Sequence, residues 1–420
     1  MAALRFRPRS EQGEALASAL LKRIERYEFQ SGKKKNKRRT KDMLAFLLTT
    51  VAFVHDLVRA RAYDASGGWL YRATRNGSEI PADCSMSARR AAKNALLELG
   101  LIERPEDLFQ DYEQPRHLAT HYRATDELVA LCAENGIHAE TLSDHFRPRE
   151  YSRGELILCR RPAKWVGCRR IPGKPIDIEV PMQVEVDAVH ISEFNEFLGR
   201  QELRGATFTG LVRIYNEGTE EGYGWDKGGR LYDLDPGSYM SIPSEQRKDI
   251  TINGEAVVEI DIKCCNLTIL YGLAGETLNW EQDPYEVGRL PRPVGKAFVT
   301  AFFGSNGSVK RWPKGVSEEL KLKHGIDAKR DYPIEAVRVV MLKHHPVLQT
   351  FIDKGLTWAD LMYLESRVIF LALYRLCGPD GVPCFPIHDC LLCPVSKREE
   401  VSEVLVRSFE EVCKVKPRLG

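Results

Sequence analysis

Two apolar runs in the second half of the chain each carry an aspartate in a position that a buried strand would normally fill with an apolar residue. Residues 383–394 read PCFPIHDCLLCP, and His388 and Asp389 interrupt this run. Residues 256–265 read AVVEIDIKCC, and Asp261 ends their apolar part. Burying a carboxylate is costly unless a partner or a metal ion meets it. If the two strands are neighbours in a sheet, the aspartates can share divalent cations.

The oxygen ligands of two aspartates suit hard cations such as Mg²⁺ or Mn²⁺. Two such ions about 3.5–4 Å apart can stabilise the attacking and the leaving oxygen of a phosphoryl displacement. Asp261 and Asp389 therefore predict a two-metal site for phosphoryl chemistry. On spacing alone the alternative stays open that both aspartates have structural roles.

Length and composition fit a soluble protein of more than one domain. The chain has 420 residues, of which 43% are hydrophobic and 29% are charged. No run of eighteen apolar residues occurs, and the N-terminus lacks the apolar stretch of a signal peptide. The eleven cysteines are scattered and odd in number, which favours reduced thiols. We expect a cytoplasmic protein that does not bind membranes.

The apolar periodicity divides the chain into three parts. Residues 1–150 are predicted to be mostly helical, with helices at 14–29, 41–64, 87–102 and 125–136. Residues 151–200 are predicted to be a β-containing connector, because 154–161 and 177–186 alternate and contain β-formers; a short helix follows at 191–200. Residues 201–420 form the third part.

Strands and helices alternate in this third part. The strand at 256–265 leads into a helix, and a β-hairpin is expected at 383–394. Further helices are predicted at 292–304, 357–378 and 396–413. Thr357 with Asp360, and Ser396 with Glu399, match capping boxes at the starts of the last two helices. This order predicts an α+β fold, in which helices cover one face of a sheet.

Four segments of this part resemble known polymerase motifs. Residues 229–261 read GRLYDLDPGSYMSIPSEQRKDITINGEAVVEID and resemble the stretch of A-family DNA polymerases that ends at their first catalytic aspartate. The matching positions are Gly229, Arg230, Leu231, Pro236, Ile242, Pro243, Arg247 and Asp261. DIKCCNLTILY, RPVGKAFVTAFFGS and PIHDCLLCP then resemble motifs A, B and C, in that order. Motif A is also similar to that of the single-subunit phage-type RNA polymerases. The resemblance covers about 210–410.

This resemblance implies a right-hand polymerase palm with reduced fingers over 201–420. It implies template-directed nucleotidyl transfer from a nucleoside triphosphate to a 3′-OH on a DNA or RNA template-primer. Two Mg²⁺ (or Mn²⁺) ions would be held by Asp261, Asp389 and the backbone of Ile262. Arg292 and Lys296, four residues apart on one helix, would bind the triphosphate, and Lys296 would also neutralise the leaving pyrophosphate.

The resemblance also implies contacts to bases and to the primer. Phe303 would stack on a base, although a core aromatic is the equal alternative. Arg230, Arg247 and His388 would contact the primer-template; for His388 a buried structural histidine is nearly as good an interpretation.

The sequence contains signals for both deoxyribonucleotide and ribonucleotide substrates. Asn266 stands where the DNA polymerases of the family use Glu against the ribose 2′-OH and the phage RNA polymerases use Gly. The short interval from Arg230 to Asp261, and Phe303 in place of a tyrosine, favour a DNA polymerase. Against this, Asn266 is not the Glu of the DNA polymerases, and Cys390 is closer to the pattern of the RNA polymerases, so an RNA polymerase or primase is the alternative. A nucleic-acid-binding protein without catalysis is the third hypothesis.

A basic run lies between the first two predicted helices. Residues 32–41 read GKKKNKRRTK. Its cations are Lys33, Lys34, Lys35, Lys37, Arg38 and Arg39. Beside a nucleic acid this run would contact phosphates, and otherwise it is a solvated loop. We expect the helical N-terminal region to serve as a thumb or a nucleic-acid clamp.

Overall fold

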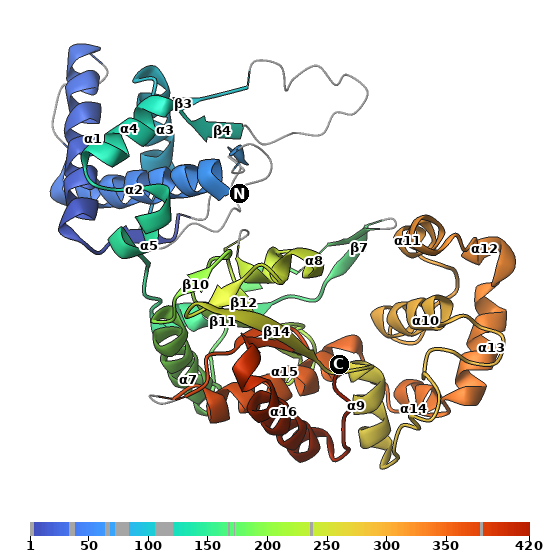
Figure 1. Cartoon of the computed structure of the whole chain (residues 1–420). Coiled ribbons are helices and arrows are strands. Elements are labelled where there is room, and N and C mark those ends of the chain that lie inside the picture. The colour runs from blue at the N-terminus through green and yellow to red at the C-terminus, as the bar shows by residue number, and fades with distance from the viewer. Residues whose placement is uncertain are drawn as a thin grey trace. The chain divides into compact units, whose positions relative to one another are not determined.

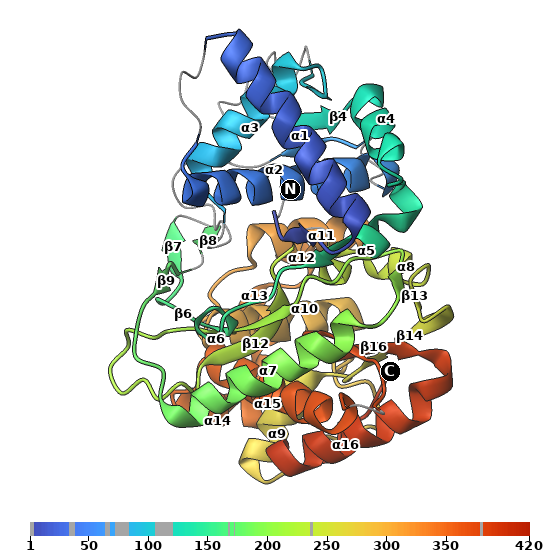
Figure 2. The same cartoon turned by 90° about the vertical axis from the view of Figure 1, so that its left-hand side faces the viewer.

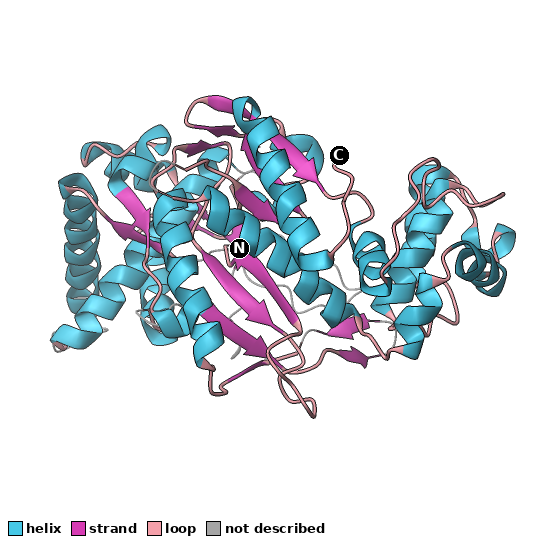
Figure 3. Cartoon of the chain, turned by 90° about the horizontal axis from the view of Figure 1, so that it is seen from below, coloured by secondary structure: helices cyan, strands magenta, loops and turns pink. Residues whose placement is uncertain are grey.

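The structure, a computed structural model, combines helices with short strands in both halves of the chain (Figure 3). It describes residues 4–32, 38–63, 68–71, 84–105, 121–166, 169–171, 173–235, 238–378 and 381–420. Helices make up 53% and strands 15% of the described residues. This mixed composition agrees with the expected α+β class.

The chain forms two compact units. The first consists of Met1–Glu150 with the short segments Thr207–Thr209 and Leu234–Ser241, and the second contains the rest of the chain. Residues 151–200, expected to be a connector, are part of the second unit.

The first unit is built around helices. They are α1 (Glu11–Gln30), α2 (Thr40–Tyr63), α3 (Met86–Glu98), α4 (Asp126–Glu134) and α5 (Leu142–His145). Figure 2 shows α1 crossing α2, and α2 also packs against α3. Ser10, Ser85 and Thr125 cap α1, α3 and α4 by accepting a hydrogen bond from the first turn. Short strands complete this unit: β1 (Phe6–Pro8) pairs with β5 (Phe146–Pro148), and β4 (His121–Ala124) lies between β2 (Leu70–Tyr71) and β3 (Ile102–Glu103).

Helix α2 carries the longest apolar segment among the described helices of this unit. The segment Asp42–Ala62 is long and apolar enough to cross a membrane by length and composition alone, but 67% of its apolar window is buried inside the fold. Val51, Val54 and Leu57 are each at most 1% exposed. Packing in a protein core accounts for this composition without a membrane.

The second unit contains an antiparallel sheet of five strands. Their order is β10 (Leu203–Arg204), β13 (Thr251–Ile252), β14 (Glu255–Asp261), β16 (Cys390–Pro394) and β15 (Phe385–Ile387). A second sheet has the order β12 (Gly228–Asp233), β11 (Leu211–Tyr215), β6 (Ile157–Arg160) and β9 (Pro175–Ile176), and β7 (Lys164–Val166) pairs with β8 (Arg169–Ile171). The expected strand at 256–265 and the hairpin at 383–394 are confirmed as β14 and as β15–β16.

Helices cover one face of the five-stranded sheet, as expected. Helix α16 (Arg398–Cys413) packs on β14 and β16, and α15 (Trp358–Leu376) packs on α16, on β12 and on α9 (Cys265–Ala274). Figure 1 shows α15 and α16 on the same side of β14. The capping box of Thr357 and Asp360 is confirmed at the start of α15. That of Ser396 and Glu399 is wrong: Ser396 donates from its N–H and its hydroxyl to Glu255 at 2.6 and 2.8 Å, and α16 begins two residues later.

A group of helices follows α9 along the chain. It consists of α10 (Arg292–Gly304), α11 (Lys314–His324), α12 (Ala328–Asp331), α13 (Ile334–His344) and α14 (Val347–Asp353). Phe298, Phe302 and Phe351 are fully buried in it. Figure 1 shows these helices together at one end of the second unit, in yellow-orange and orange.

One predicted element of the connector is wrong. Residues 177–186 were expected to form a strand, but helix α7 (Met182–Gly199) begins within them. The apolar residues Val184, Ala188 and Ile191 lie on its buried face, and this helical spacing outweighs the local alternation of valines. The other expected strand is shorter than predicted, because the short helix α6 (Arg153–Leu156) precedes β6.

Candidate metal centre

The strand pairing brings the two predicted aspartates together. Asp261 ends β14 and lies opposite Cys390, the first residue of β16 and the neighbour of Asp389. The N–H of Ile262 donates to the carbonyl oxygen of Asp389 at 3.2 Å. Two acids 128 residues apart in the sequence therefore stand at one end of adjacent strands. The backbone of Ile262, the third predicted metal ligand, lies beside them.

Left-handed backbone turns position both aspartates. His388 has φ +56°, and with Asp389 it forms the two-residue turn between Ile387 and Cys390. Hairpin turns of this length require positive φ at their first central residue. Cys264, three residues after Asp261, has φ +51° just before α9. Such conformations cost of order 1–3 kcal/mol in residues other than glycine and concentrate at functional sites.

A third carboxylate joins the two aspartates. Glu365 of α15 is fully buried, and both of its oxygens accept hydrogen bonds from Arg230 of β12, each at 2.6 Å. Ligand atoms of Glu365, Asp389 and Cys265 all lie within 4.8 Å of one another. Sequence reasoning missed Glu365, although it is the one carboxylate among the buried residues of the otherwise apolar face of α15. Like Asp389, Glu365 is a carboxylate within an apolar pattern, and this signal is present in the sequence.

The three carboxylates interact electrostatically. Loss of hydration and then the charge of Asp389 raise the pKa of Asp261 to about 6. Burial raises the pKa of Asp389, against the lowering effect of Arg230 and Lys296. Burial also raises the pKa of Glu365 to about 7, with Asp389 and Asp261 adding to the increase and Arg230 opposing it. The nearby Arg230 and Lys296 only partly offset this negative charge.

The residues present fit a divalent cation. Asp261 and Asp389 offer the hard oxygen ligands that Mg²⁺ and Mn²⁺ prefer. Burial raises the pKa of both carboxylates, and a bound cation would favour their charged forms. Cys265 supplies a soft thiol, which is a poor ligand for Mg²⁺. Burial raises the pKa of this thiol well above its ordinary value, so it is protonated at neutral pH.

Of the predicted triphosphate ligands, Lys296 contributes its charge to the acidic centre. It is an exposed residue of α10, and its charge lowers the pKa of both Asp261 and Asp389. The preceding Gly295 allows α10 to approach the neighbouring loop, because a Cβ there would lie 1.9 Å from the carbonyl oxygen of Tyr285. Arg292 is also exposed, but its Nε donates to Asp283 at 2.6 Å. A triphosphate would have to compete with that carboxylate.

The structure corrects the role expected of Phe303. Its ring is 2% exposed and packs against Phe302 and Phe351, with ring centres 5.7 and 5.2 Å apart. No face of the ring is free for a base, so the alternative of a core aromatic holds.

By contrast, Oδ1 of Asn266 is buried and has no hydrogen-bond partner among the described residues. This acceptor, one residue beyond Cys265, is available to a ligand.

The residues expected to contact the primer differ in their availability. Both oxygens of Glu259 accept hydrogen bonds from Arg247, at 2.9 and 2.8 Å. Arg230 is similarly engaged by Glu365. His388 is exposed and packs edge-on against Tyr232. Partial loss of hydration and the charges of Arg230 and Arg247 lower the pKa of His388 to about 4, so it is neutral at physiological pH. Of the three, His388 is the most accessible.

The basic run of the N-terminal unit is only partly described. Lys33, Lys34, Lys35 and Lys37 lie outside the described residues, whereas Arg39 is exposed. The prediction that Arg38 contacts phosphates disagrees with the position of its side chain. Its side chain is 6% exposed, donates to Glu28 at 2.6 Å and stacks over Phe46 at 3.5 Å. A paired and stacked arginine of this kind holds α1 and α2 together.

Comparison with known proteins adds no family to these observations. No model of a known protein family matches the chain, and no curated protein matches it.

Proposed function

We propose that the chain is a template-directed nucleotidyltransferase that depends on divalent metal ions, and that it acts as a DNA polymerase. The observation that carries this proposal is that Asp261 and Asp389 stand at one end of adjacent strands, with the buried Glu365 of α15 close to Asp389. The order of Asp261 and Asp389 along the chain agrees with the resemblance of 210–410 to A-family polymerase motifs.

In this proposal Asp261 and Asp389 hold two Mg²⁺ or Mn²⁺ ions, with the backbone of Ile262 beside them. Such ions, when bound, supply charge stabilisation for phosphoryl displacement. Lys296 neutralises the triphosphate and the leaving pyrophosphate from α10. Arg230 is held by Glu365 in a fixed orientation next to Asp389, and His388 faces the primer end as a neutral side chain.

One observation favours a second candidate, an RNA polymerase or primase on the same site. The unpaired buried Oδ1 of Asn266 is a hydrogen-bond acceptor, and a ribose 2′-OH is a donor that deoxyribose lacks. A site built to bond a hydroxyl discriminates strongly against an analogue without it.

Primer extension tests the proposal and separates the two candidates. The full chain is incubated with a labelled primer on DNA and RNA templates, with dNTPs and NTPs in parallel reactions containing Mg²⁺, Mn²⁺ or EDTA. Metal-dependent extension with dNTPs supports the DNA polymerase, and preferential use of NTPs supports the second candidate. Absence of extension under every condition, with retained nucleic-acid binding, would leave a binding protein without catalysis.

A further inference from the structure

Helix α3 of the N-terminal unit carries cations along one face. Lys93 is four residues from Arg89 and three from Arg90, so its side chain neighbours both of them on the helix surface. Arg104, which follows β3, adds a fourth cation from another segment. None of these residues belongs to the metal centre or to the basic run at 32–41.

Arg89 is buried, and among the described residues it forms no ion pair. It is 5% exposed, and its Nη1 has no hydrogen-bond partner among the described residues. Burial lowers its pKa, and the charge of Arg90 acts in the same direction. A guanidinium stays protonated in proteins, and a buried charge without a partner costs several kcal/mol. The fold therefore maintains an unfavourable charge that an anion would satisfy.

Two adjoining pockets give an anion access to these cations. One, of about 140 Å³, is lined by Met86, Arg89, Arg90, Lys93 and Asn94. At about 30 Å³ for each water molecule, it has room for roughly four or five waters and thus for one phosphate group. The second, of about 500 Å³, shares Lys93 and Asn94 and adds Leu97, Glu98 and Arg104.

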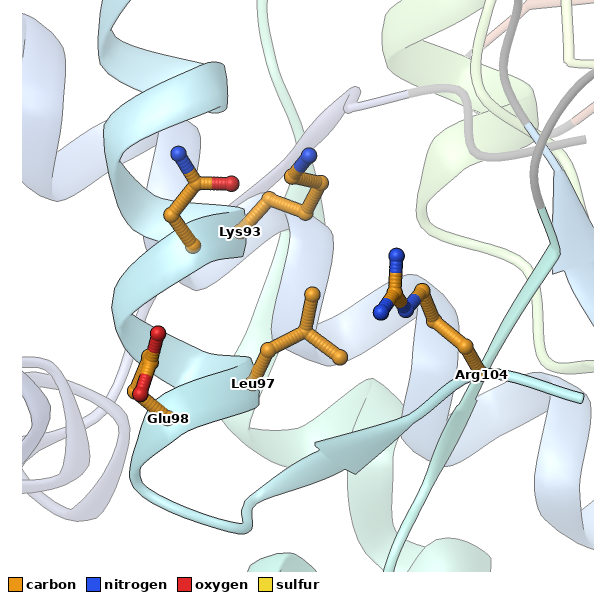
Figure 4. Close-up of a pocket in the computed structure, with 5 residues that line it drawn as sticks. Lys93, Leu97, Glu98 and Arg104 are labelled. Atoms are coloured by element: carbon orange, nitrogen blue, oxygen red, sulfur yellow. The ribbon is translucent and has the colours of Figure 1, made fainter. Parts of the chain in front are cut away.

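The charges lining these pockets are mostly positive. Figure 4 shows Lys93 and Arg104 extending from α3 and from the segment after β3 toward the same space, with Leu97 between them and Glu98 on the side of α3 away from Arg104. Among the described residues that line the two pockets, Glu98 is the one carboxylate, and it belongs to the larger pocket. Nζ of Lys93 lies 5.8 Å from the ring centre of Tyr122.

We propose that the pocket formed by Arg89, Arg90 and Lys93 binds a phosphate group. Arg89 provides a guanidinium that is fixed by burial, and Lys93 and Arg90 add charge at the entrance. The phosphate comes from the backbone of a nucleic acid, an assignment that rests on the proposed function; a free nucleotide or inorganic phosphate offers the same chemistry. Binding of phosphate as such does not depend on the proposed function.

The first test measures thermal unfolding of the full chain in phosphate and in chloride at equal ionic strength. Phosphate should raise the unfolding midpoint of the wild-type protein, because a ligand that binds only the folded state stabilises it. Arg89→Met should abolish this increase. Without phosphate the same variant should be as stable as the wild type or more so, since it replaces an unpaired buried charge by an apolar side chain of similar length. Lys93→Gln, at a partly exposed position, should reduce the increase without affecting the fold.

The control is Arg23→Gln in the same unit, which removes an equal charge from an exposed pair with Glu127. It should keep the full response to phosphate. Equal midpoints in phosphate and chloride for the wild-type protein, or an increase that Arg89→Met retains, would overturn the proposal.

The second test identifies the source of the phosphate. Binding of a labelled primer-template duplex to the full chain is measured at several salt concentrations. Arg89→Met should weaken binding roughly threefold to tenfold and reduce the slope of log K against log salt by about 1, as expected for one lost phosphate contact. If Arg89→Met abolishes the response to inorganic phosphate but leaves duplex binding unchanged, the pocket binds free phosphate or a nucleotide.

An Asp389→Asn variant should lose primer extension while keeping the response to phosphate, so failure of the polymerase proposal is distinguishable from failure of this one.

Discussion

At the scale of single residues, the chemistry of the candidate metal centre depends on carboxylates whose pKa values are raised by burial. Asp261 keeps contact with solvent at the end of β14, yet its surroundings and the charge of Asp389 raise its pKa to about 6. A divalent cation would compete with the proton for the same oxygens. Proton binding and metal binding at this residue are therefore linked.

This linkage predicts the pH dependence of stability in the metal-free protein. Because the pKa of Asp261 is above its ordinary value of 3.8 in the folded state, folding favours the protonated form. The resulting stabilisation is complete below pH 3.8 and is lost as the pH rises through about 6. Thermal unfolding in EDTA at several pH values measures it for the wild type and for Asp261→Asn.

Relative to the wild type, Asp261→Asn should become increasingly stable as the pH rises from about 4 to about 6, and the difference should level off above that range. In saturating Mg²⁺ the wild type should instead be more stable than Asp261→Asn, because only the charged carboxylate binds the ion. Glu403→Gln, on the exposed side of α16, serves as the control and should show no such trend. A constant difference between Asp261→Asn and the wild type at all pH values would contradict the raised pKa.

The buried acceptor of Asn266 gives a prediction about the choice of sugar. If the chain is a DNA polymerase, Asn266 crowds the ribose, and Asn266→Gly should raise ribonucleotide use relative to deoxyribonucleotide use by roughly one to two orders of magnitude. If the chain is an RNA polymerase, the same change removes a hydrogen bond to the 2′-OH and lowers ribonucleotide use. The ratio of kcat/KM for NTP and dNTP distinguishes these outcomes. An unchanged ratio would show that Asn266 does not contact the sugar.

At the scale of elements, the second unit is stabilised by a buried ion pair between α7 and β11. Arg213 is fully buried; its Nη1 donates to Asp187 at 2.5 Å, and its Nε donates to the carbonyl oxygen of Gly229 at 2.8 Å. The hydroxyl of Tyr215 donates to the same carboxylate at 3.0 Å. Removal of Asp187 would leave a buried guanidinium uncompensated.

We therefore expect Asp187→Ala to lower the free energy of unfolding by about 3–5 kcal/mol. Glu196→Ala is the matched control on the same helix, since Glu196 pairs with Arg200 on the surface, and it should cost less than about 1 kcal/mol. Denaturant unfolding of both variants measures the difference. Similar losses for the two variants would mean that the buried pair contributes no more than a surface pair.

Elements with a long and regular apolar pattern were predictable from the sequence. The periodicity located α2 and α15, and a β-hairpin was expected at 383–394, although the position of its turn at His388 and Asp389 came only from the structure. Helix α7 was missed because its valines also fit the alternation of a strand. The capping box at Ser396 was wrong because Glu255, which is distant in the sequence, accepts the hydrogen bonds of that serine. Local patterns cannot report such long-range partners.

At the scale of the whole molecule, the candidate metal centre collects residues from segments far apart in the chain. Arg230, Asp261, Lys296, Glu365 and Asp389 come from two sheets and two helices. The sequence predicted four of these five residues as functional, through apolar runs and motif order. It did not predict the ion pair between Glu365 and Arg230, because a pairing between a helix and a strand leaves no local signal in the sequence. Phe303 illustrates the same limit, since only the packed helices show that its ring is enclosed.

The two units also divide the proposed roles. The second unit contains every residue of the candidate metal centre, and the first contains the α3 pocket. If both proposals hold, substitutions at α3 change the affinity for nucleic acid, whereas substitutions at the strand ends change the rate of the chemical step. Measurements of binding and of single-turnover rate on the same variants therefore assign a role to each unit.

The most direct test of the central claim is single-nucleotide incorporation by Asp389→Asn in Mg²⁺, compared with the wild type and with Glu403→Gln. The substitution keeps the size of the side chain and removes the charge. It should lower the rate by roughly 10³-fold or more, because transition-state charge would lose several kcal/mol of stabilisation. Binding of the primer-template should stay nearly unchanged, and Glu403→Gln should extend the primer at the wild-type rate. Extension by Asp389→Asn at a rate close to that of the wild type would contradict the assignment of a metal-dependent centre to these strand ends.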